Sequence, residues 1–116
     1  MEKYIDSEIT EYWIHFQAGE LKKNHIYPQA MIKCYHEDDF LLQINFYPDA
    51  KSVPPNHYDK KKKLVYLRYP MSMYVNVMDI LRNEKPIFFR YNTAHHVGLV
   101  RTGKEPVGEG EYDADF

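Results

Sequence analysis

The sequence predicts an α+β fold, with one curved antiparallel sheet of about six strands and a single helix packed on one face. Three observations predict it. Most of the chain alternates apolar and polar residues with a period of two, which is typical of half-buried strands. One stretch, beginning at Met73, changes to the helical period. Short turns between the alternating runs favour antiparallel neighbours.

The first expected strand runs from 9 to 18. Its alternation places Trp13 and His15 on the more polar face and apolar side chains on the other. Gly19 and Glu20 break the pattern, and a polar connection is expected at 21–24.

A hairpin is predicted next, from two alternating runs at 30–36 and 40–47. Asp38 and Asp39 lie between them, and short acidic side chains favour tight turns because they hydrogen-bond to their own backbone. Pro48 ends the second run. The segment 48–63 contains three prolines and a run of lysines, so we expect a mobile surface loop there.

A fourth strand is expected at 64–69, followed by the helix. The helix buries residues spaced by three and four, which are Tyr74, Val77, Met78 and Leu81. It must end before Pro86, because the residue before a proline disfavours helical geometry.

The last two strands, 87–92 and 97–102, form a second predicted hairpin. Gly98 inside the second of them indicates a bulge or a close backbone approach. From 104 onward the chain is acidic and rich in glycine, and we expect this tail to fray. The sequence contains no repeat and no linker, so a single domain spanning 1–116 is predicted.

Composition excludes several classes of protein. A formal net charge of −2 gives no overall attraction to nucleic acid or anionic lipid. The single cysteine, Cys34, excludes an internal disulfide and fits a reducing compartment. The first residues lack the apolar segment of a signal peptide, and no apolar run is long enough to cross a bilayer. We therefore expect a cytoplasmic protein that does not enter membranes.

The predicted sheet has more aromatic surface than one helix can cover. Aromatic residues make up 16% of the chain, and eleven residues are tyrosine. Either the sheet curls into a partial barrel, or its outer face buries against a second copy. The leading hypothesis is a binding protein that acts as a homodimer or higher homo-oligomer through this face, with a small molecule or a protein as a further partner. The residues expected at the interface or in a ligand cleft are Trp13, His15, Tyr35 and Tyr47, with His57 and Tyr58 on the loop that closes it.

A second hypothesis is a small enzyme with His95 or His96 as the general base. The signal is weak, because no catalytic motif accompanies either histidine. Cys34 and His36 are two residues apart on one strand face, about 7 Å, which is beyond hydrogen-bond reach. The sequence contains no set of residues at metal-ligand spacing and no phosphate-binding glycine loop, so no cofactor or metal is expected. A protein without catalytic activity is favoured.

A third hypothesis is a single-stranded nucleic-acid binder. Lys60, Lys61, Lys62 and Lys63 precede Arg68 in a segment that also contains tyrosines, and such proteins hold phosphates on lysine and stack bases on rings. Asp and Glu outnumber Lys and Arg by 17 to 15, however. A run of lysines is also a common way to protect a strand edge. The balance of charge argues against nucleic acid as the partner.

Overall fold

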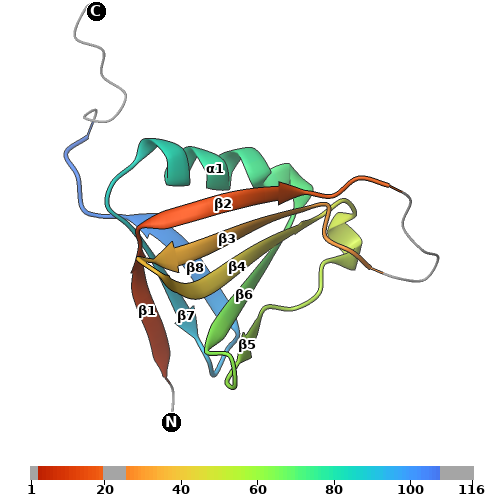
Figure 1. The fold of residues 1–116 in the computed structure, drawn as a ribbon, viewed down its shortest axis with the longest axis horizontal. Helices are drawn as coiled ribbons and strands as arrows, with labels where there is room; N and C mark the ends of the chain where they lie inside the picture. The colour runs from red at the N-terminus through yellow and green to blue at the C-terminus, as the bar shows by residue number, and fades with distance from the viewer. Residues whose placement is uncertain (1–2, 20–25, 108–116) are drawn as a thin grey trace, which may run out of the picture.

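The computed structural model describes residues 3–19 and 26–107 and has the predicted α+β class. In these residues, eight strands form two sheets accompanied by one α-helix (Figure 1). The first sheet has five strands in the order β2-β3-β4-β6-β5, and the second has three in the order β1-β7-β8. The single sheet of about six strands expected from the sequence is therefore replaced by two sheets, which do not close into a barrel.

Strands make up most of the described chain. The strands are β1 (Tyr4–Ile9), β2 (Glu11–Phe16), β3 (Ala30–His36), β4 (Asp39–Tyr47), β5 (His57–Asp59), β6 (Leu64–Pro70), β7 (Ile87–Asn92) and β8 (Val97–Thr102). The helix α1 (Tyr74–Asn83) and the 3₁₀ turns η1 (Ala50–Ser52) and η2 (Met71–Met73) complete the set. The expected connection at 21–24 lies outside the described residues, as does the tail beyond 107.

The first predicted strand is divided between the two sheets. The chain changes sheet at Thr10, so that β1 pairs with β7 while β2 pairs with β3. The sequence did not indicate a strand before Ile9, because Asp6, Ser7 and Glu8 interrupt the apolar pattern. In the structure Asp6 faces outward and is paired with Arg90 of β7, which accommodates its charge at the surface.

The segment 48–63, expected to be a loop, has regular structure of its own. It contains η1 and the short strand β5, which pairs with β6 at the edge of the sheet. Because the chain passes along that edge before entering β6, β6 lies parallel to β4 rather than antiparallel. The expectation of a structureless connection is therefore wrong, while the mobility of the segment remains a prediction.

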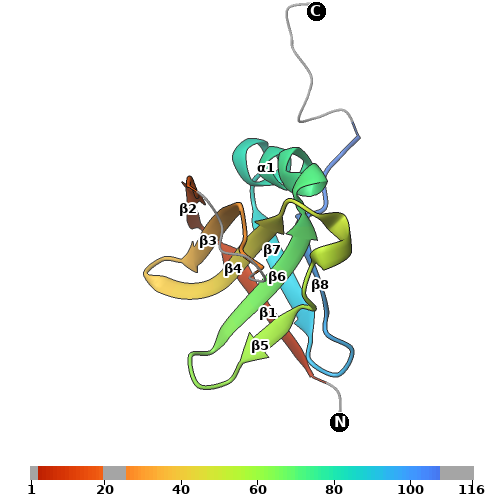
Figure 2. The same ribbon diagram turned by 90° about the vertical axis from the view of Figure 1, so that its right-hand side faces the viewer.

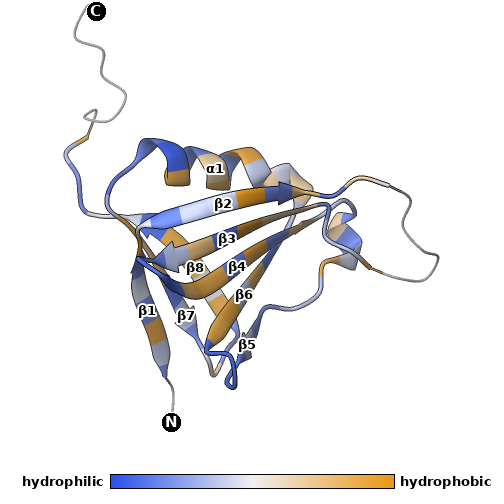
Figure 3. Ribbon diagram, viewed as in Figure 1, coloured by the Kyte–Doolittle hydropathy of each residue, from blue (hydrophilic) through white to orange (hydrophobic). Residues whose placement is uncertain are grey.

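The core lies between the two sheets, and α1 closes one end of the space between them (Figures 1 and 2). Hydrophobic residues are concentrated along β3, β4 and β6, in the middle of the larger sheet (Figure 3). The helix contributes the buried Val77, Met78 and Leu81, as its spacing predicted, whereas Tyr74 is only half-buried. None of the described helices has the length and apolar character needed to cross a membrane.

Gly98 marks the point where the two sheets approach each other. A Cβ at this position would lie 2.5 Å from Cδ2 of Leu67 in β6 and 3.1 Å from the Arg90 carbonyl oxygen. Gly98 pairs in regular register with Tyr91, so the predicted close approach is correct and a bulge is not required. The glycine lets β8 pack directly against the larger sheet.

Candidate functional site

The outer face of the five-stranded sheet carries the exposed aromatic residues. Strand register aligns Trp13 of β2 with Lys33 of β3 and Gln43 of β4. The same row continues to Tyr66 on β6 and His57 on β5. Period-two alternation in the sequence predicted the faces of these residues except His57, which was expected in a loop, and the strand order determines which of them are neighbours.

Trp13 is at the centre of an ordered group of side chains. Its Nε1 donates a hydrogen bond of 3.1 Å to the Tyr35 hydroxyl, and the Tyr35 ring stacks on Phe40 with centroids 5.2 Å apart. The Lys33 ammonium lies 5.9 Å from the Trp13 ring and 5.7 Å from Phe40, within range of a cation–π attraction to both. The His15 ring meets Trp13 edge-on at 4.4 Å. We call these five residues the aromatic surface.

The aromatic surface remains accessible despite these contacts. Trp13 is 52% exposed, although a large ring of this kind is normally covered. Its neighbours fix its orientation, so binding would cost little side-chain entropy. A preordered, accessible aromatic group is suited to contact another surface.

A shallow hollow adjoins Trp13 and Tyr35 at the end of the β3–β4 hairpin. Its volume is about 450 Å³, and its acidic rim is formed by Glu11, Glu37 and Asp38. Within the described residues, no three His, Cys, Asp or Glu side chains converge in a way that could hold a metal ion. The hollow therefore offers carboxylates beside aromatic rings, a combination that favours positively charged groups.

The structure brings Trp13, His15 and Tyr35 together but separates them from the other expected cleft residues. Tyr47 is buried and lies four residues along β4 from the Trp13 row, about 13 Å. His57 lies on the opposite edge of the sheet, four strands from Trp13 or roughly 19 Å. Tyr58 is half-buried against the core. A single cleft lined by all six residues is therefore not formed.

The lysines and Arg68 of the nucleic-acid hypothesis occupy different environments. Lys60–Lys63 form the exposed turn between β5 and β6. The Arg68 guanidinium donates a 2.6 Å hydrogen bond from Nη1 to the Pro55 carbonyl oxygen and lies 5.3 Å from the Tyr66 ring. Arg68 is therefore engaged in holding the segment before β5.

The two candidate base histidines lie in the exposed turn between β7 and β8. His96 has a positive φ of 57°, and its Nδ1 shares a hydrogen bond of 2.9 Å with the Tyr91 hydroxyl. The backbone N–H of His95 donates to the Asn92 side chain. These contacts stabilise the turn, and the Tyr91 phenol rather than a carboxylate faces the His96 ring.

Cys34 is fully buried in β3, and His36 hydrogen-bonds through Nδ1 to the Glu8 carbonyl oxygen. Burial raises the pKa of the Cys34 thiol to about 12, so the thiol stays protonated and unreactive at neutral pH. This sulfur has a packing role, consistent with the weak signal for catalysis.

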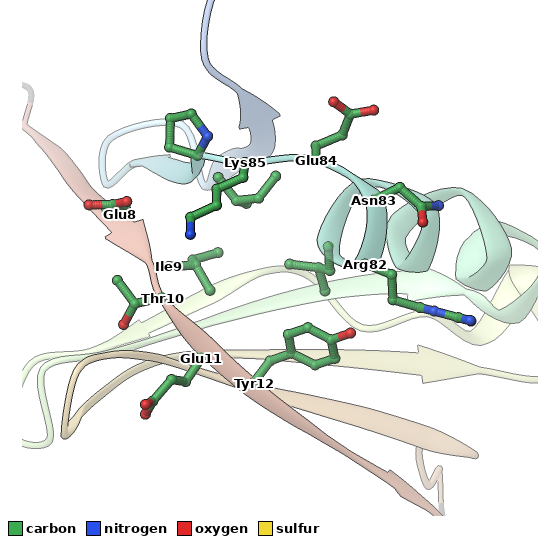
Figure 4. Close-up of a pocket in the computed structure, with 12 residues that line it drawn as sticks. Glu8, Ile9, Thr10, Glu11, Tyr12, Arg82, Asn83, Glu84 and Lys85 are labelled. Carbon is green, nitrogen blue, oxygen red and sulfur yellow. The ribbon is translucent and has the colours of Figure 1, made fainter. Parts of the chain in front are cut away.

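A second cavity, the junction pocket, lies where the turn from β1 to β2 meets the end of α1 (Figure 4). Its volume is about 480 Å³. The residues that define it here are Ile9, Tyr12, Leu81, Arg82, Lys85 and Ile87. Two parts of the chain form it, 8–12 and 81–87, which are far apart in the sequence, so no local sequence pattern could have indicated it.

The junction pocket combines an apolar floor with a positive charge. Ile9, Leu81 and Ile87 are buried beneath it. The Lys85 side chain extends toward Ile9, whereas the carboxylates of Glu11 and Glu84 point away (Figure 4). Lys85 forms no ion pair with another residue that the structure describes. The Glu8 carboxylate also lines the pocket, so the pocket presents an apolar floor with charges of both signs around it.

Comparisons of this chain with protein-family models, with curated proteins and with solved structures find no match.

Proposed function

We propose that this chain is a binding protein without catalytic activity, which acts as a homo-oligomer through the aromatic surface. The observation that carries the proposal is the ordered but exposed Trp13 on the edge strand β2. Apolar area removed from water contributes about 25 cal/mol per Å², and a tryptophan is among the largest contributors at interfaces. Burial of Trp13 against a second copy is the simplest use of this surface.

Charge supports association between identical copies. The net charge is only −2, so long-range repulsion between two copies is weak and is further screened by salt. Lys33 lies among the rings and the carboxylates of Glu11, Glu37 and Asp38 lie at the rim, so the surface presents both signs of charge. Opposite charges on one surface allow two copies to orient without facing like charges.

The test is the mass of the protein in solution as a function of concentration, measured by light scattering after size-exclusion chromatography. We expect a mass above that of the monomer, and Trp13→Ala should lower it. Tyr4→Ala is the matched control, because Tyr4 is also aromatic and 54% exposed but lies on β1 of the other sheet. If Trp13→Ala and Tyr4→Ala have the same effect, or the wild-type protein is a monomer throughout, the proposal is wrong.

A second candidate function is binding of a small molecule in the junction pocket. The observation that favours it is the Lys85 ammonium directed over an apolar floor (Figure 4). We propose a compact apolar carboxylate as the ligand class, and phenylacetate as the probe. Phenylacetate should raise the melting temperature of the protein while phenylacetamide, its neutral analogue, should not, and Lys85→Gln should remove the difference. Equal shifts with both probes would contradict this assignment.

The proposed location of the protein is the cytoplasm. The burial of Cys34 supports it only weakly, since a protected single thiol is compatible with a reducing environment without requiring one. Fractionation of cells that express the full chain tests the location directly.

A further inference from the structure

In the part of the chain that the structure describes, no strand pairs with the open side of β2, so backbone groups on that side have no partner on a neighbouring strand. Gln17 lies opposite Gln29, and its N–H donates a 2.9 Å hydrogen bond to the Gln29 carbonyl oxygen. Along two antiparallel strands, residue pairs that hydrogen-bond to each other alternate with pairs that do not, so the bonded residues of β2 are those that share the parity of Gln17. The N–H and C=O groups of Tyr12, Ile14 and Phe16 therefore point away from β3, toward the open side.

The side chains along this edge are apolar and accessible. Ile14 is 38% exposed and Phe16 is 59% exposed, although both lie on the face of the sheet that packs on the core in the neighbouring strands. Trp13 is half-exposed on the opposite face. No Lys, Arg or Pro occurs in β2, whereas natural sheets normally protect a long edge with such residues.

We propose that β2 pairs antiparallel with β2 of a second copy, with Ile14 on the two-fold axis, so that one continuous sheet crosses both copies. This inference rests on the proposed function and specifies its interface. In this register Tyr12 lies opposite Phe16 of the second copy, and both residues direct their backbone groups toward the partner. Ile14 faces its own equivalent in the same way.

The register is self-complementary in side chains as well as in backbone. It places Trp13 opposite His15 of the second copy, which repeats across the interface the ring pair already present within β2. It places the carboxylate of Glu11 opposite the neutral Gln17, so like charges do not meet. A two-fold interface requires this property, because the same patch must fit itself.

Other registers of the two β2 strands leave some outward-pointing backbone groups without a partner. If Trp13 were on the axis, Tyr12 would lie opposite Ile14, and Phe16 would lie opposite Thr10. Thr10 lies just before the first residue of β2, and its hydroxyl accepts a hydrogen bond from the Glu37 N–H. The backbone of Phe16 would then have no regular partner. The Ile14-centred register pairs every outward-pointing backbone group of β2.

The test is an intermolecular disulfide in the Ile14→Cys variant of the full chain. Residues directly opposite in a hydrogen-bonded antiparallel pair have Cα atoms about 5.5 Å apart, which is within the range of a disulfide. We expect oxidised glutathione to convert this variant to a covalent dimer on denaturing gels. Leu99→Cys is the matched control, since Leu99 is 43% exposed on β8, an edge strand of the other sheet. Cys34 is present in both variants and is buried, so it does not contribute.

A second variant tests the backbone pairing. Ile14→Pro removes an N–H that points to the open side and leaves the ladder between β2 and β3 intact, because prolines are tolerated on such an edge. We expect its dimer dissociation constant to rise at least about tenfold, since hydrogen bonds at the axis are lost. Its circular dichroism spectrum should match that of the wild-type protein.

The outcomes separate this inference from the proposed function. A wild-type dimer in which Ile14→Cys cross-links and Leu99→Cys does not supports the inference. A wild-type dimer in which Leu99→Cys cross-links instead, or in which a folded Ile14→Pro variant keeps its affinity, overturns the inference while self-association stands. A wild-type monomer at every concentration overturns both.

Discussion

The two edges of the five-stranded sheet are protected to different degrees. β5 has only three residues and leads directly into the turn of Lys60–Lys63. β2 has six residues, with Glu11 as its one acidic side chain and no lysine or proline. Short strands and lysines prevent another chain from pairing with an edge. The β5 edge is therefore protected against pairing with another strand, whereas the β2 edge lacks these protections.

The difference also shows which apolar residues serve the fold. In the middle of the sheet, apolar side chains of β3 and β4 are completely buried. On β2, Ile14 and Phe16 face the same side of the sheet but remain partly exposed. The fold of one copy therefore buries the apolar side chains of β2 only in part.

The largest expected effect compares Ile44 in the centre of the sheet with Ile14 at its edge. Ile44→Ala should lower the free energy of unfolding by about 2–5 kcal/mol, because Ile44 is fully buried and the substitution leaves a cavity. Ile14→Ala should lower it by less than about 1 kcal/mol in dilute solution, because much of that side chain already contacts water. Urea unfolding at low protein concentration measures both.

Equal losses of stability in the two variants would contradict the comparison, since Ile14 would then belong to the core. Unfolding of Ile14→Ala should also become independent of protein concentration, whereas the wild-type protein should become more stable as concentration rises.

Local patterns in the sequence predicted the parts of the fold that depend on neighbours in the chain. The β3–β4 hairpin follows from alternation on either side of Asp38, and α1 follows from the spacing of Val77, Met78 and Leu81. The transfer of the chain between sheets at Thr10 and the parallel pairing of β4 with β6 are not local. Both depend on which strands meet after the chain has folded, and alternation carries no information on that choice.

The same limit applies to the candidate site. Alternation placed Trp13 and His15 on one face of their strand, and the structure agrees. It also placed Tyr35 on that face but could not give the strand order, which puts His57 at the far edge of the sheet. The junction pocket could not be predicted at all, since Ile9, Leu81 and Ile87 meet only in the folded chain.

An intermediate effect on the free energy of unfolding is expected for Asn56, whose side chain hydrogen-bonds the segment just before β5 to two other parts of the chain. Its Oδ1 accepts a 2.8 Å hydrogen bond from the Arg68 N–H in β6, and its Nδ2 donates a 3.0 Å bond to the carbonyl oxygen of His96, in the turn between β7 and β8 of the other sheet. Asn56→Ala should therefore lower the free energy of unfolding by about 1–3 kcal/mol, because two backbone groups lose their partner.

The matched control for this substitution is Asn76→Ala, on the exposed face of α1, which should change the stability by less than about 0.5 kcal/mol. Equal values for the two variants would mean that water replaces the Asn56 contacts and that the link between the sheets at this edge is unimportant.

The smallest effect is expected when Lys60–Lys63 are all replaced by glutamine. The turn should persist, since Asp59 Oδ1 accepts hydrogen bonds from the backbone N–H groups of Lys61 and Lys62, which glutamine retains. The free energy of unfolding should change by less than about 0.5 kcal/mol. The mass in solution should also stay the same, because β5 is too short to pair stably even without the lysines. A rise in mass would show that the lysines, rather than the strand length, protect this edge.

The same variant tests the nucleic-acid hypothesis: if a labelled oligothymidine binds the wild-type protein at low salt and not the variant, the lysine turn contacts phosphates as well.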